Sequence, residues 1–274
     1  MNPKMKLSNG TMKHTYGTAA ALLASAMLTT GATGQSQFSH NPNQGPALAT
    51  AAVYPIGAPS CGPINITCNQ AKDIEPFGSV ACESAGVTAD NQYYRHFIMA
   101  DYGLPDEYTV TCVTIGIETA LADPAAGGVQ PITINLYDIG PAGFPAPVPL
   151  PSLIGTADFD IADQTFTLIE LPISASGTSG GLVVEISVPD AVNNGLLHSF
   201  FLGANSLPES CLSYLSSVAC GTPNPVPTAA VGFPNTHYVM NVKLEESCPA
   251  DLDGNGNVGI EDFLELLASW GPCP

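Results

Sequence analysis

The C-terminal part of the chain carries oxygen-bearing side chains at the spacing of a calcium-binding loop. In a twelve-residue loop of this kind, side-chain oxygens come from the first, third, fifth and twelfth positions, and a backbone carbonyl comes from the seventh. A hard dication takes six to eight such oxygens at about 2.3–2.6 Å. The spacing therefore predicts a Ca²⁺ site with the ligands Asp251, Asp253, Asn255, Asn257 and Asp262.

Two glycines fit the same interpretation. Gly256 is sixth in the loop, where the chain must turn sharply through a conformation that a Cβ atom would obstruct. Gly259 is ninth, a position at which a water molecule can take the place of a side-chain ligand.

A helix is predicted directly after the loop. Apolar residues recur there at the 3.6-residue period, and they are Ile260, Phe263, Leu264, Leu267 and Trp270. Gly271 and Pro272 end the pattern, as glycine and a following proline usually do. Before the loop, the run Cys248-Pro249-Ala250 leaves no room for an entering helix.

A calcium loop followed by a single helix resembles one half of a type I dockerin. The resemblance covers residues 248–274, about a tenth of the chain, and no second copy of the repeat occurs elsewhere. It implies calcium binding and docking on a cohesin-like or cell-surface scaffold protein. It also implies proximity to polysaccharide-degrading enzymes. The positions at which that family selects its partner hold Ile260 and Glu261 here.

The first 34 residues have the composition of an export signal. A basic start precedes the apolar run 19–28, which is too short to span a bilayer, and small residues at 32–34 allow cleavage before Gln35. No other stretch approaches 18 apolar residues. We therefore expect a mature chain without a membrane span, secreted or held at the cell surface.

The mature chain is strongly acidic. Residues 1–34 contain three of the six basic residues and none of the 24 acidic ones, so a formal charge of −21 remains after their removal. Only Lys72, Arg95 and Lys243 are then positive. Because binding to phosphate backbones depends on lysine and arginine, nucleic acid is excluded as a partner, and anionic membranes are disfavoured.

The eight cysteines of an exported chain favour disulfides. Cys248 and Cys273 bracket the calcium motif, so a bond between them would join its ends. Cys211 and Cys220 flank a predicted turn and form the second candidate pair. The other two bonds would come from four cysteines in an order that the sequence leaves open, and these are Cys61, Cys68, Cys82 and Cys112.

Between the signal and the tail, the sequence predicts a linker and one β-domain. Residues 35–60 are rich in proline, alanine and serine and are expected to be a linker. Residues 61–246 alternate apolar and polar positions in short runs separated by turn residues, which predicts an antiparallel, jelly-roll-like β-sandwich. The predicted strands are 92–99, 108–118, 131–139, 153–161, 165–173, 181–189, 198–204 and 236–244.

Several residues of this domain have patterns that occur in catalytic sites. The run 177–181 matches the GxSxG nucleophile pattern, but it leads into a strand and is interpreted as a turn. Asp158, Asp160 and Asp163 are interpreted as solvated carboxylates, with a structural calcium site as the alternative. Glu118, Glu170 and Glu185 are glycosidase candidates that nothing in the sequence distinguishes.

The remaining candidates are expected to be structural. His96, His198 and His237 lie in predicted strands, and Arg95, flanked by aromatic residues, is expected to form an internal ion pair. Sugar-binding sites use aromatic platforms, but the single tryptophan is in the tail. The tyrosines that could be exposed form no stripe, and they are Tyr102, Tyr108, Tyr137 and Tyr214.

Three hypotheses follow. The first is a secreted, calcium-binding, non-catalytic β-sandwich protein attached to an extracellular or cell-surface assembly through its tail. The second is a glycan-binding protein or a glycoside hydrolase acting on polysaccharide. The third is a structural surface protein whose tail is an intramolecular clasp. We favour the first.

Overall fold

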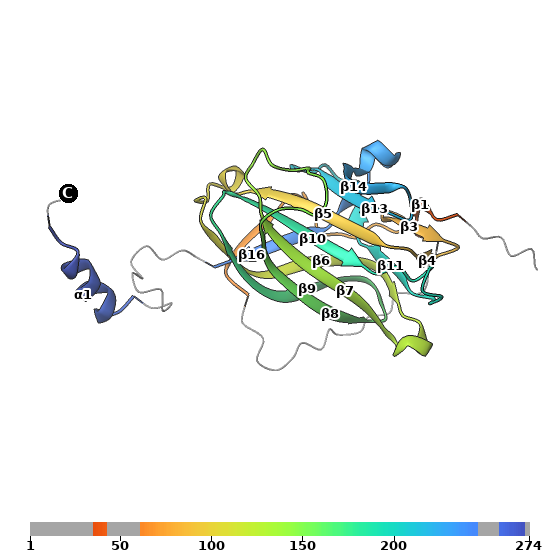
Figure 1. Cartoon of the computed structure of the whole chain (residues 1–274), viewed down its shortest axis with the longest axis horizontal. Helices are drawn as coiled ribbons and strands as arrows, with labels where there is room; N and C mark the ends of the chain where they lie inside the picture. The colour runs from red at the N-terminus through yellow and green to blue at the C-terminus, as the bar shows by residue number, and fades with distance from the viewer. Residues whose placement is uncertain (1–34, 43–60, 246–257, 272–274) are drawn as a thin grey trace, which may run out of the picture. The chain divides into compact units, whose positions relative to one another are not determined.

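A computed structural model of the chain describes residues 35–42, 61–245 and 258–271. Within these residues the chain is mainly β, as Figure 1 shows. Every pair of neighbouring strands in this part of the chain is antiparallel. The antiparallel β-sandwich predicted from the sequence is therefore confirmed. No helix among the described residues is long and apolar enough to cross a membrane.

One layer of the sandwich is a six-stranded sheet. Its strands, in spatial order, are β14 (Thr222–Pro227), β13 (Ser213–Ser217), β5 (Asn91–Ile98), β10 (Gly181–Val188), β7 (Val129–Asp138) and β8 (Leu153–Ala162). Prolines at 223, 225 and 227 explain why β14 lies at an edge, where a strand does not need every N–H group for pairing.

The facing layer is built around the long strand β6. Its main path is β11 (Ser199–Leu202), β6 (Tyr108–Leu121), β16 (Met240–Leu244) and β2 (Ile64–Thr67), and β9 (Gln164–Gly177) also pairs with β6. β8 and β9 are consecutive in the chain but belong to different sheets, so the chain crosses between the layers near residue 163.

The remaining elements are short. A three-stranded sheet contains β1 (Gln37–His40), β3 (Val80–Ser84) and β4 (Val87–Thr88), and a two-stranded sheet contains β12 (Ala204–Asn205) and β15 (His237–Tyr238). Three 3₁₀ helices are η1 (Met99–Tyr102), η2 (Pro124–Ala126) and η3 (Thr228–Val231). Among the described residues, the single α-helix is α1 (Ile260–Ala268).

The core lies between the two large sheets and follows the alternation of the sequence. In β10, Leu182, Val184 and Ile186 are fully buried between the layers, whereas the intervening Glu185 and Ser187 belong to the outer face. The alternate apolar residues of β7 and β16 are buried in the same core, and they are Ile132, Ile134, Leu136, Met240, Val242 and Leu244. Hydrophobic burial of these alternate positions is the main force that holds the two sheets together.

The segment between β7 and β8 forms a second, smaller apolar cluster on the outer face of the six-stranded sheet. Phe144 packs against Tyr94 and Tyr214, and Leu150 belongs to the same cluster. The Val148 N–H donates to Oδ1 of an asparagine in β14, at 3.1 Å. This proline-rich excursion therefore covers part of the outer face, from β7 to the far edge.

The disulfides correct the predicted pairing of Cys211 with Cys220. The observed bonds are Cys61–Cys112, Cys68–Cys211 and Cys82–Cys220. Strand β13 runs between Cys211 and Cys220, and five extended residues span about 17 Å. Disulfide-bonded cysteines need Cα atoms roughly 4.4–6.8 Å apart. Nearness in the sequence was therefore misleading, and Cys68 and Cys82 take the partners that local pairing would have used.

The linker prediction also changes at its start. Residues 37–40 were expected in a linker, but they form β1, which pairs with β3 and adds a strand to the domain. The rest of the predicted linker, residues 43–60, lies outside the described residues. The export signal at 1–34 and the proposed Cys248–Cys273 bond also lie outside them.

Candidate functional site

The tail helix α1 agrees with the periodicity of the sequence. It begins at Ile260 and ends at Ala268, with Ser269 and Trp270 still donating N–H groups to carbonyls of the last turn. The predicted helix is therefore confirmed as an element.

Asp262 is the one predicted calcium ligand within the described residues. Its Oδ2 accepts a hydrogen bond from the Gly259 N–H at 2.6 Å, so the carboxylate reaches back from the twelfth loop position toward the ninth. Asp262 is 2% exposed, whereas every other residue of 258–271 is exposed. A desolvated carboxylate on the loop side of the helix is the oxygen donor that a hard cation takes, so this residue fits a calcium ligand.

The other four predicted ligands, Asp251, Asp253, Asn255 and Asn257, lie outside the described residues. Within the described residues, no group of three or more histidine, cysteine, aspartate or glutamate side chains is arranged to hold a metal ion. The calcium site thus stays a prediction that rests on loop spacing and on the orientation of Asp262.

The same helix presents apolar side chains to solvent. Trp270 is 78% exposed, and its apolar neighbours on the helix are exposed as well. These residues, which we call the α1 apolar face, are Ile260, Phe263, Leu264, Leu267 and Trp270.

In the body, the GxSxG run is a tight turn between β9 and β10. Ser179 Oγ donates to Asp138 Oδ1 at 2.6 Å, and Gly180 has φ of 73°, which favours glycine. Burial raises the pKa of Asp138, but hydrogen bonds from Ser179, Thr178 and Tyr108 outweigh this effect and leave the pKa below its ordinary value. The serine therefore ties the turn to an ionised aspartate, which agrees with the structural interpretation.

Glu118 is completely buried. Its carboxylate accepts from the N–H groups of Phe77 and Ser79 at 2.9 and 2.7 Å and from Asn41 Nδ2 at 3.1 Å. Burial raises the pKa of Glu118, and these hydrogen bonds oppose the shift. Because no part of this side chain reaches the surface, it cannot contact a polysaccharide. It holds the N-terminal segment to β6.

Glu170 and Glu185 differ in their surroundings. Glu170 forms a half-exposed ion pair with Lys243, at 2.6 Å. Glu185 is nearly buried on the outer face of the six-stranded sheet, where it accepts from Asn135 Nδ2 and Tyr137 Oη, each at 3.1 Å. Burial raises the pKa of Glu185, against the effect of these two donors. Glu185 thus combines a pKa raised by burial with a small exposure to solvent, two properties that a general acid needs.

The neighbours of Glu185 do not complete a glycosidase site or a sugar platform. Asp158 lies on the same face of the sheet as Glu185, two strands across and two residues along. Strand spacing places their backbones about 12 Å apart. That separation exceeds the roughly 5–9.5 Å of paired catalytic carboxylates. Tyr94, Tyr137 and Phe144 are no more than 9% exposed, so their ring faces are covered.

The aspartate cluster has separate partners. Asp158 Oδ1 accepts from Thr133 Oγ1 at 2.7 Å, and Asp163 Oδ1 accepts from the Ala122 N–H at 2.7 Å. The interpretation as ordinary strand and turn carboxylates agrees with these contacts.

The histidines also have structural contacts. His96 Nε2 lies 3.3 Å from the Ile139 carbonyl oxygen, and burial lowers the pKa of its ring. His198 Nδ1 accepts from the Asp123 N–H at 3.0 Å. His237 Nδ1 lies 2.5 Å from the Leu207 carbonyl oxygen.

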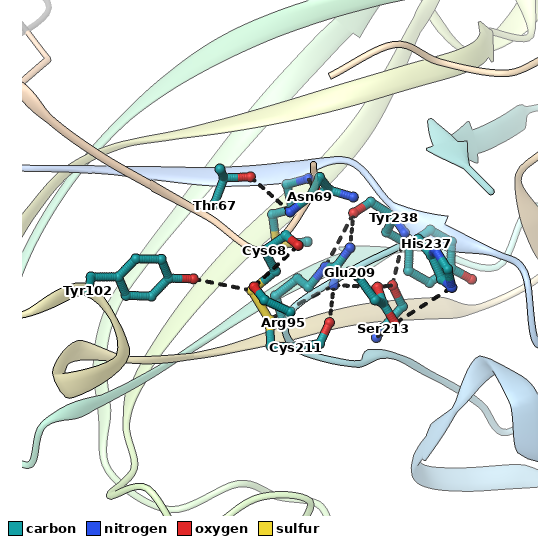
Figure 2. Close-up of a disulfide and its surroundings, with 12 residues drawn as sticks. Thr67, Cys68, Asn69, Arg95, Tyr102, Glu209, Cys211, Ser213, His237 and Tyr238 are labelled. Carbon is teal, nitrogen blue, oxygen red and sulfur yellow. Dashed lines mark hydrogen bonds and ion pairs between the residues drawn. A yellow bond between two sulfur atoms is a disulfide. The ribbon is translucent and has the colours of Figure 1, made fainter. Parts of the chain in front are cut away.

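Arg95 is fully buried, and Figure 2 shows the residues around it. Its guanidinium donates to Glu209 Oε2 and to the Cys211 carbonyl, both at 2.6 Å, and to the Tyr238 carbonyl. Burial lowers the pKa of Arg95, while the adjacent Glu209 carboxylate opposes that shift. The predicted internal ion pair is confirmed, and its partner is Glu209.

Sequence reasoning missed two parts of this arrangement. Glu209 lies 114 residues from Arg95, and no local pattern connects them. Asn41 was assigned to the linker, yet it is buried against Glu118 and Thr119. The residues beside Asn41, which include Ser39, His40 and Pro42, give no strand signal.

Comparison with family models, curated proteins and solved structures finds no match to this chain. The functional argument therefore depends on the residues themselves.

Proposed function

We propose that the chain is an exported, calcium-binding, non-catalytic β-sandwich protein that is attached to an extracellular or cell-surface assembly through its C-terminal tail. The observation that carries the proposal is the buried, inward-turned carboxylate of Asp262 at the start of a helix whose remaining residues are exposed. Calcium would supply the positive charge that gathers the oxygens of the acidic loop and fixes it to α1.

The body supports this proposal in two ways. Its three disulfides, which join residues 51, 143 and 138 apart, are compatible with an oxidising extracellular compartment. The residues with catalytic patterns have structural partners instead: Ser179 binds Asp138, Glu118 holds the N-terminal segment, and Glu170 pairs with Lys243.

The test is a calorimetric calcium titration of the mature chain 35–274 against a chain that ends at residue 247. We expect binding in the micromolar to millimolar range, roughly, because few carboxylates serve the loop and extracellular calcium is plentiful. The shortened chain and an Asp262→Ala variant should give no corresponding heat. Unchanged heat after removal of the tail would refute the calcium assignment.

A further inference from the structure

The α1 apolar face is exposed to solvent along its whole length. Helix α1 has nine residues, and helices of that length are marginal in water without tertiary packing. The five residues of the α1 apolar face are 47–78% exposed, with Leu267 the least and Trp270 the most exposed. Contiguous exposed apolar surface of this kind marks an interface.

The charge of the tail restricts what can cover this face. Residues 248–274 contain five acidic residues and no basic one. Two of the acidic residues, Glu261 and Glu265, are exposed on α1 itself, and Glu261 is the nearer of the two to the apolar face by helical spacing. A surface that buries the face must therefore approach carboxylates, which favours lysine or arginine at its border.

The chain's own body offers little basic surface. Arg95 is fully buried in its pair with Glu209, and Lys243 is paired with Glu170. Among the described residues, Lys72 is then the one lysine or arginine that forms no ion pair. Residues 35–247 carry 19 acidic residues. Long-range repulsion thus opposes docking on the chain's own body, and it opposes docking on a second copy for the same reason.

We propose that the α1 apolar face docks on a separate protein, in an apolar groove that is bordered by lysine or arginine residues. This inference rests on the proposed function, because it assumes that the tail is the attachment site. It specifies that the partner is a different protein and that its docking surface is basic. The two competing partners for this face are the chain's own body, in an intramolecular clasp, and a second copy of the chain, in a homodimer.

The single tryptophan makes the test specific for the tail. Trp270 is the only tryptophan of the chain, so its emission reports on this helix and not on the body. We would titrate the mature chain 35–274 with calcium present, at low salt, using a synthetic amphipathic peptide with a leucine stripe bordered by lysines. Matched peptides carry glutamate in place of lysine, or glutamine in place of leucine.

The leucine–lysine peptide is expected to give a saturable blue shift of the Trp270 emission. The leucine–glutamate peptide should bind at least tenfold more weakly, and the glutamine–lysine peptide should give no shift. A double Leu264→Ser and Leu267→Ser variant should lose the response, whereas Leu197→Ser, an exposed leucine of the body, should keep it. Replacing Glu261 and Glu265 by glutamine leaves the apolar face intact and should weaken binding of the leucine–lysine peptide about threefold to tenfold.

Three results would overturn the inference. Equal binding of the lysine and glutamate peptides would show that charge does not select the partner. A concentration-dependent blue shift without peptide, together with a dimer in sedimentation, would assign the face to a second copy. No peptide response would assign it to the chain's own body or to no partner. If the chain still gives heat on calcium titration in these cases, only this inference is wrong. If the chain gives no such heat, the proposed function itself is wrong.

Discussion

Arg95 and Glu209 form a 2.6 Å ion pair in which the guanidinium is inaccessible and the carboxylate is 8% exposed. Arg95 comes from β5, while Glu209 lies in the segment before β13, two residues from the cysteine that bonds to Cys68. The only arginine of the chain and one disulfide therefore fix the same segment to the sandwich (Figure 2).

The Glu209→Gln variant should lose about 3–5 kcal/mol of unfolding free energy, because a buried guanidinium is left without its counter-charge. Denaturant unfolding measures this loss. The matched control is Glu170→Gln, which removes the half-exposed pair with Lys243 and should cost about 1 kcal/mol or less. Equal losses in the two variants would contradict the assigned role of Arg95.

Peptide mapping under non-reducing conditions should recover Cys61–Cys112, Cys68–Cys211 and Cys82–Cys220. Replacing Cys68 and Cys211 together by alanine should lower the unfolding free energy by about 2–5 kcal/mol, because the bond closes a long loop in the unfolded chain. Recovery of a peptide in which Cys211 is bonded to Cys220 would refute the arrangement of β13 described above.

The N-terminal strand should contribute to stability. Asn41→Ala removes donors to Glu118 and to Thr119 Oγ1, at 3.1 and 2.8 Å, and should cost about 1–3 kcal/mol. Gln37→Ala, at the exposed start of β1, is the control and should change stability little. If Asn41→Ala leaves the unfolding free energy unchanged, residues 35–42 do not stabilise the domain and belong to the linker.

Glu185→Gln should stabilise the protein at neutral pH. Burial raises the pKa of Glu185, so the folded state binds its proton more tightly than the unfolded state does. The contribution of Glu185 to folding stability is then most favourable at a pH below the ordinary carboxyl pKa of about 4.3. It is lost as the pH rises through the raised pKa of the folded state. Glutamine can still accept from Asn135 and donate to Tyr137.

The stability difference between Glu185→Gln and the parent chain should therefore grow from acidic to neutral pH and then level off. Unfolding curves at several pH values measure this difference, in which the other carboxylates cancel. A difference that stays constant with pH, or that shrinks as pH rises, would contradict the raised pKa.

The sequence predicted the strands whose faces differ most in polarity. In β7, β10 and β16 every second residue enters the core, so the period of two was visible. Strand β14 contains three prolines and was missed, because an edge position tolerates what a central strand does not. Strand β1 was missed because four residues are too few to show a period.

The polar contacts were less predictable than the strands. The pairing of Arg95 with Glu209 and of Cys68 with Cys211 depends on which strands become neighbours, and their sequence separations exceed 100 residues. In contrast, the position of Asp262 at the start of α1 followed from local rules, since loop spacing and helix period are both short-range patterns.

The central claim is that calcium orders the acidic tail through Asp262. The most direct measurement is the calcium stoichiometry of residues 35–274, by calorimetry, in the parent chain and in the Asp262→Asn and Glu265→Gln variants. Asparagine keeps an acceptor for the Gly259 N–H but removes the charge, and Glu265 is an exposed carboxylate of the same helix. We predict one calcium ion for the parent chain and for Glu265→Gln, and none for Asp262→Asn. Equal binding by all three proteins would contradict the account.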